Sequence, residues 1–69
     1  MLTINLGAPV LTKKRVEALV RERLPELKDV EFSVSRNSTG EWWWGTEGSG
    51  FKHDWSGFVH PDGRVDGPY

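Results

Sequence analysis

The sequence contains no cysteine, which excludes disulfides and thiolate zinc ligands as sources of stability for this small chain. It also contains no apolar run near the roughly 20 residues of a membrane span. Its first five residues, Met-Leu-Thr-Ile-Asn, are too short and polar for a signal peptide. We therefore expect a cytoplasmic protein, and the lack of cysteine agrees with a reducing compartment.

A strong excess of positive charge is missing as well. The formal net charge is −1, with seven Lys/Arg and five Asp/Glu in residues 1–36 but two Lys/Arg and five Asp/Glu in residues 37–69. The half that contains the tryptophans is therefore the acidic half. This distribution argues against binding to a phosphate backbone through the tryptophans.

No catalytic or metal-binding arrangement is recognisable in the sequence. The two histidines, His53 and His60, lack a metal-ligand spacing, and His60 is explained by the turn sequence His-Pro-Asp-Gly over residues 60–63. Neither glycine-flanked serine, Ser49 or Ser56, sits in the strand-to-helix turn of a nucleophile elbow. We predict a protein that is not an enzyme and uses no cofactor or metal, and no motif identifies a family.

Hydrophobic periodicity predicts a single α+β domain over residues 1–69. Thr12 is a good N-cap for a helix that runs to about Leu24, where Pro25 disfavours helical geometry. Alternating residues predict strands over 2–6, 30–35, 41–46, 51–60 (kinked near Ser56-Gly57) and 64–66. The expected order is β-α-β-β-β(-β), an antiparallel-rich twisted sheet with one helix packed on one face.

The run Glu-Trp-Trp-Trp-Gly over residues 41–45 is the main functional clue. Successive residues of a strand point to opposite faces, so Trp43 must face away from its two neighbours. A two- or four-residue loop over residues 37–40 pairs Arg36 with Glu41, which places Trp43 in the core. A three- or five-residue loop reverses the faces.

We favour the first register, because two further indoles would crowd the layer that one helix can cover. It puts Trp42 and Trp44 on the open face of the sheet. There they would form an apolar patch large enough that another segment, a partner or a ligand is expected to cover it. One candidate cover is the C-terminal segment, with Phe58 and Pro68-Tyr69, folded over the patch as a second small core. The others are a protein partner and a stacked ring ligand.

Our leading functional hypothesis is a non-catalytic protein-binding module or small inhibitor that docks its Trp-rich sheet face onto a protein partner. By size and composition alone, it is typical of small inhibitors from phages and mobile elements. The predicted partner-binding residues are Trp42, Trp44, Trp55 and Arg36. A monomer and a homodimer both agree with this hypothesis.

The alternative hypothesis is single-stranded nucleic-acid binding, with bases stacked on the indoles. The residues predicted to contact phosphates are Lys13, Lys14, Arg15 and Lys52, helped by Arg36. Three of these cations lie in the first turn of the predicted helix, where they oppose the helix dipole but can meet an anion together with free backbone N–H groups.

Overall fold

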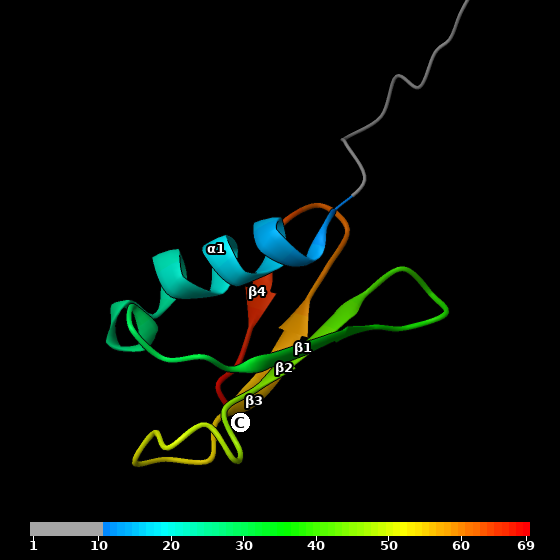
Figure 1. The fold of residues 1–69 in the computed structure, drawn as a ribbon. Coiled ribbons are helices and arrows are strands. Elements are labelled where there is room, and N and C mark those ends of the chain that lie inside the picture. The colour runs from blue at the N-terminus through cyan, green and yellow to red at the C-terminus, as the bar shows by residue number, and fades with distance from the viewer. Residues whose placement is uncertain (1–10) are drawn as a thin grey trace, which may run out of the picture.

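The computed structural model describes residues 11–69, and the strand predicted over residues 2–6 lies outside this range. The described chain forms a helix, a short 3-10 helix and four strands (Figure 1). No helix within this range is long and apolar enough to cross a membrane. In sequence order the elements are α1 (Lys13–Arg23), η1 (Pro25–Leu27), β1 (Ser33–Arg36), β2 (Trp42–Gly45), β3 (Ser56–Val59) and β4 (Val65–Asp66).

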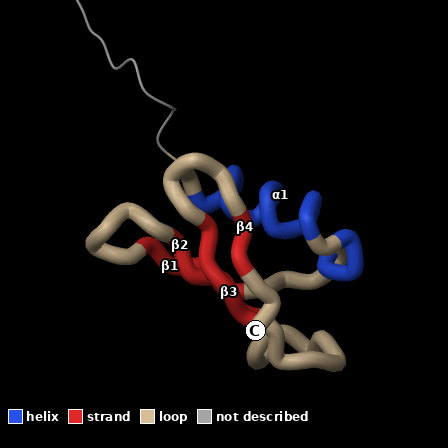
Figure 2. Tube along the Cα trace, turned by 180° about the vertical axis from the view of Figure 1, so that it is seen from behind, coloured by secondary structure: helices blue, strands red, loops and turns tan. Residues whose placement is uncertain are grey.

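The four strands form one antiparallel sheet in the order β1-β2-β3-β4, so each strand pairs with its neighbours in the sequence. α1 covers one face of this sheet, and the view from behind shows the strands lying side by side (Figure 2). The predicted α+β class, with a β-meander and one helix on one face, is confirmed.

The helix begins and ends where the sequence predicts. Thr12 has extended backbone, and its Oγ1 accepts a hydrogen bond from the backbone N–H of Arg15 at 3.2 Å, which is the bond of an N-cap. Val16 and Val20 lie on one side of the helix and are fully buried. Leu24, the residue before Pro25, leaves the helical region with φ −127° and ψ 83°.

The strand predicted over residues 30–35 begins later, at Ser33, and Arg21 bonds to the backbone that precedes it. The Arg21 guanidinium donates from Nε to the carbonyl of Leu27 at 3.1 Å and from Nη2 to the carbonyl of Val30 at 2.7 Å. Its Cζ also lies 4.8 Å from the ring centroid of Phe32. The Val30 carbonyl is thus bonded to Arg21, and β1 begins at Ser33 because its partner β2 ends at Gly45, the residue opposite Ser33.

The strand predicted over residues 51–60 is also shorter, because its first half is a loop closed by Thr46. The buried Thr46 hydroxyl donates to the carbonyl of His53 at 2.7 Å and accepts from the backbone N–H of Trp55 at 2.8 Å. The backbone N–H of Thr46 donates to the carbonyl of Trp55 at 2.8 Å. These bonds tie residue 46 to residues 53–55, and β3 begins at Ser56.

The favoured register of the first hairpin is wrong. Arg36 pairs with Trp42 rather than with Glu41, and Val34 pairs with Trp44. The turn is the reason: the backbone N–H of Asn37 donates to the carbonyl of Glu41 at 2.7 Å, and Gly40 has φ +91°. A glycine in the left-handed region closes a three-residue hairpin loop, which shifts the register by one residue.

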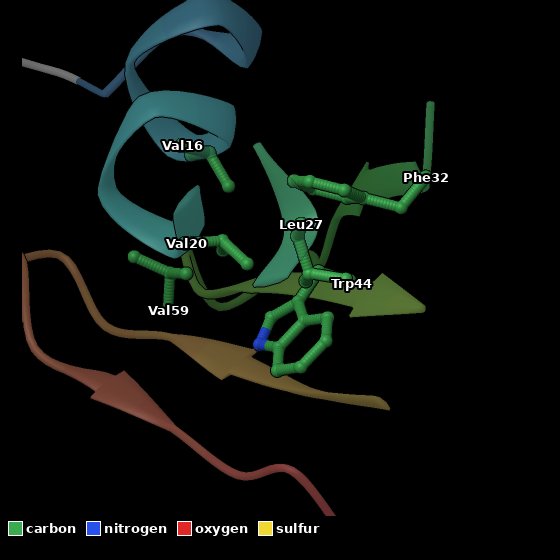
Figure 3. Close-up of a cluster of buried hydrophobic side chains, with 6 residues drawn as sticks. All are labelled: Val16, Val20, Leu27, Phe32, Trp44 and Val59. Atoms are coloured by element: carbon green, nitrogen blue, oxygen red, sulfur yellow. The ribbon is translucent and has the colours of Figure 1, made fainter. Parts of the chain in front are cut away.

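Because of this register, Trp44 lies in the core and is fully buried. Its ring meets that of Phe32 edge to face, with centroids 6.2 Å apart. Figure 3 shows the side chains that converge beneath α1. They are Val16, Val20, Leu27, Phe32, Trp44 and Val59.

Candidate protein-binding face

The sheet face opposite α1, here called the open face, has two aromatic side chains at its centre. A row of paired residues crosses all four strands: Ser35, Trp43, Phe58 and Asp66. Trp43 and Phe58 are directly opposite each other, so their side chains are cross-strand neighbours. Phe58 is 36% exposed and Trp43 is half-buried. The pair forms an apolar centre that α1 does not cover.

The Trp43 ring lies along its own strand, over Gly45. A β-carbon placed on Gly45 would come within 2.4 Å of the Trp43 ring carbons Cη2 and Cζ2. The two residues share a face because they are two positions apart. Gly45 therefore leaves the space that the outer carbons of the Trp43 ring occupy.

A histidine held between two carboxylates borders this aromatic pair. His60 Nδ1 lies 2.7 Å from Glu41 Oε2, and His60 Nε2 lies 2.5 Å from Asp66 Oδ2. Strand alternation puts Glu41, His60 and Asp66 on the open face with Trp43 and Phe58. The His60 side chain is 18% exposed, whereas those of Glu41 and Asp66 are 37% and 36% exposed.

The charges in this cluster stabilise one another. Hydrogen bonds to Asp66 and then to Glu41 raise the pKa of His60 above its ordinary value of 6.5. The same bond to His60 lowers the pKa of Asp66 below 3.8. A carboxylate within hydrogen-bond distance of each ring nitrogen favours the imidazolium form of His60 over the neutral form. Both ring nitrogens are occupied, so the ring has no free nitrogen to act as a general base.

None of the four residues predicted to bind a partner lies on the open face. Trp44 is buried, and Trp42 is half-buried on the same helix-covered side, packed against the core. Arg36 is exposed and pairs with Trp42, so it shares that side. The expectation that Trp42 and Trp44 form the open face is wrong, for the reason given by the hairpin turn.

The fourth predicted residue, Trp55, belongs to the loop between β2 and β3. It is half-buried and stacks on the exposed ring of His53, with centroids 5.4 Å apart and planes 11° apart. Phe51 meets Trp55 edge to face at 5.0 Å. The rings of Phe51, His53 and Trp55 thus pack against one another within the loop. Phe51 and Trp55 also pack against the core.

The basic residues of the nucleic-acid hypothesis lie away from Trp43. Lys13, Lys14 and Arg15 are exposed in the first turn of α1, on the other side of the sheet from the open face. Lys52 is exposed in the loop between β2 and β3. Their placement does not form a cationic track beside the open-face aromatics.

The described residues offer neither a metal site nor a deep apolar pocket. Over residues 11–69, no group of three or more His, Asp and Glu side chains is arranged to hold a metal ion. A shallow groove of about 510 Å³ lies between α1 and β4. Its lining mixes apolar side chains with charges of both signs: Leu19, Glu22, Arg23, Arg64, Val65 and Asp66, together with Gly63.

Sequence reasoning missed the aromatic pair and the histidine cluster for different reasons. Trp43 and Phe58 would follow from strand alternation once the register is known, so the missed signal was the left-handed glycine after Ser38-Thr39. In the sequence, His60 lies 19 positions after Glu41 and 6 positions before Asp66. Only the strand pairing brings these three residues together. Comparison of the chain with protein-family models, curated proteins and solved structures finds no match.

Proposed function

We propose that this protein is a non-catalytic protein-binding module whose docking surface is the open face, with Trp43 and Phe58 as the anchors. The supporting observation is the pairing of two large aromatic side chains on the sheet face that α1 leaves uncovered. Aromatic anchors surrounded by polar groups are typical of protein interfaces. Here Ser33, Ser35 and the His60 cluster supply the polar surround.

The occupant that this surface fits is a folded protein with an apolar patch of similar size. The open face carries Glu41 and Asp66 against one imidazolium, so its charge is small and does not favour a polyanion. An inhibitor that occludes a surface of another protein is one form of such a module. A cytoplasmic location remains part of this proposal and rests on the absence of cysteine.

The proposal that the module is non-catalytic is supported by the state of the histidines. His60 is bonded through both nitrogens, and the exposed His53 is stacked on Trp55. Neither has a serine hydroxyl among its hydrogen-bond partners within residues 11–69. Nucleic-acid binding receives less support, because the basic residues predicted for it lie apart from Trp43.

Site-specific photo-crosslinking tests this function. A benzoyl-phenylalanine at position 58 keeps an aromatic ring at the centre of the open face, and the same probe at the exposed Ala18 of α1 is the matched control. We expect one discrete protein adduct from position 58 that reforms with the purified partner and disappears with Trp43→Ala, while position 18 gives none.

Three outcomes would contradict the proposal. Equal adducts at positions 18 and 58 would indicate non-specific capture. Adducts with nucleic acid alone would favour the alternative function. An adduct of twice the chain mass, with no other protein, would show that the open face pairs with a second copy. Circular dichroism of Trp43→Ala must match the wild type, so that loss of binding is not loss of fold.

A further inference from the structure

The histidine cluster joins residues that lie far apart in the sequence, at the ends of strands that pair in the sheet. Glu41 precedes β2, His60 follows β3, and Asp66 lies in β4. β4 is an edge strand whose ladder with β3 contains only two residue pairs. A short edge strand with one neighbour is the part of a sheet that opens most easily. The bond between His60 and Asp66 is therefore one of the contacts that hold β4 in place, together with its ladder to β3 and the bond of its Asp66 carbonyl to the Trp44 indole.

The chain around and after β4 covers the buried tryptophan. The Trp44 Nε1–H donates to the backbone carbonyl of Asp66 at 3.3 Å. A β-carbon on Gly67 would lie 3.2 Å from Trp44 Cζ2, so this residue packs directly on the ring. The backbone N–H of Tyr69 donates to the carbonyl of Ser56 at 2.8 Å. Residues 64–69 thus form a strap over one edge of Trp44.

The geometry of His60 favours a proton on each ring nitrogen. A neutral imidazole has one N–H and one lone pair. With Glu41 at one nitrogen and Asp66 at the other, the neutral form would turn its lone pair toward a carboxylate. Only the imidazolium donates to both carboxylates. Loss of the proton therefore replaces one of these two attractions with a repulsion.

We infer that protonated His60 is a latch that holds residues 64–69 against the sheet and over Trp44, and that loss of this proton releases the strap. The latch belongs to the isolated protein and needs no partner. Its failure and the failure of the proposed docking function are therefore separate results. The His60 cluster borders the open face, so release of the strap also changes that surface.

The other charges around the latch act in known directions. Arg64, in the turn before β4, opposes the proton on His60, whereas Asp66 and Glu41 favour it and outweigh Arg64. Arg23 of α1 and Arg64 both favour the ionised form of Asp66. The raised pKa of His60 sets the upper pH limit of the latch. The lowered pKa of Asp66 sets its lower limit.

Hydrogen exchange of the wild-type protein between pH 6 and pH 10 tests the latch. The reporters are the Tyr69 amide and the Trp44 indole N–H, and the Leu24 amide, which bonds to the Val20 carbonyl, reports global unfolding. After correction for base catalysis, protection at the two reporters should fall as the His60 ring titrates. The fall should be about tenfold for each unit by which the strap raises the His60 pKa.

Variants give independent controls. His53→Gln removes the only other histidine of the chain and should leave the exchange profile unchanged. Asp66→Asn should move the His60 titration toward its ordinary value and lower reporter protection at pH 6. If either variant fails to fold, the pH dependence of hydrogen exchange in the wild-type protein still tests the latch. The latch would be overturned if protection of the two reporters did not change as His60 titrates. It would also be overturned if their protection fell together with that of the Leu24 amide.

Discussion

The indole of Trp44 lies so close to Gly57 that a β-carbon on this glycine would come within 2.8 Å of Trp44 Nε1. The two residues are direct cross-strand partners. The same β-carbon would also come within 2.1 Å of the Asp66 carbonyl oxygen, which accepts the indole N–H. The absence of a side chain at Gly57 therefore lets the Trp44 indole be buried and also donate its hydrogen bond to the Asp66 carbonyl.

Replacing Gly57 with alanine should destabilise the fold by about 3 kcal/mol or more, because the added methyl meets backbone that cannot move freely. Urea unfolding followed by circular dichroism measures the effect. The neighbouring Ser56→Ala adds no atoms and should cost less than about 1 kcal/mol. Equal stability of Gly57→Ala and the wild type would show that Trp44 is not packed against β3.

Single alanine variants of Trp43 and Trp44 should differ widely. Trp44→Ala removes the largest fully buried side chain and should cost about 3–5 kcal/mol, enough to unfold much of a domain this small. Trp43→Ala removes a half-buried ring from the open face and should cost about half as much or less. Free energies of unfolding from urea titrations provide the comparison, and the reverse order would contradict the observed register.

Replacing Arg21 with lysine should destabilise the protein by about 1–3 kcal/mol. A lysine keeps the charge but cannot donate to the Leu27 and Val30 carbonyls from one planar group while lying over Phe32. Arg15→Lys is the matched control, because Arg15 is exposed on the same helix. Thermal unfolding of both variants is the measurement, and equal midpoints would mean that the bonds of Arg21 are replaceable.

Stability should be greatest between the titrations of Asp66 and His60. The pKa of His60 is raised in the folded protein, so its contribution is complete below about pH 6.5 and is lost as pH rises through the folded value. The pKa of Asp66 is lowered, so its contribution is complete above about pH 4 and is lost as pH falls through the folded value. Urea midpoints from pH 2 to pH 10 should therefore trace a dome.

His60→Gln should flatten the alkaline side of this dome, and His53→Gln should not. Glutamine can bond to one carboxylate but carries no charge that pH can remove. An alkaline fall in stability that survives in His60→Gln would assign the pH dependence to another group.

The elements with strong local signals could be predicted from the sequence. Thr12 and Pro25 bound the helix, and Val16 and Val20 define its buried side, because capping and periodicity are properties of a few adjacent residues. The His-Pro-Asp-Gly turn also forms as predicted: the Gly63 N–H donates to the His60 carbonyl at 2.8 Å, with Gly63 at φ +93°.

The faces of the tryptophans could not be predicted with the same certainty. They depend on whether the first hairpin loop has an odd or an even number of residues, which the conformation of Gly40 decides. The crowding expected beneath the helix does not occur, because Gly57 and Gly67 leave space for the Trp44 indole. Glycine in a sequence indicates freedom of the backbone but does not reveal which side chain will lie against it.

The relative solvent exposure of the Trp43 and Trp44 indoles tests the central claim most directly, since the proposed docking face depends on Trp43 facing outward. Paramagnetic relaxation of the indole N–H signals by a soluble gadolinium chelate measures this exposure in the wild-type protein. We predict strong broadening of the Trp43 signal, with the Trp44 signal unaffected at pH values below the titration of His60. Broadening of Trp44 with protection of Trp43 at neutral pH would contradict the register and the docking face built on it.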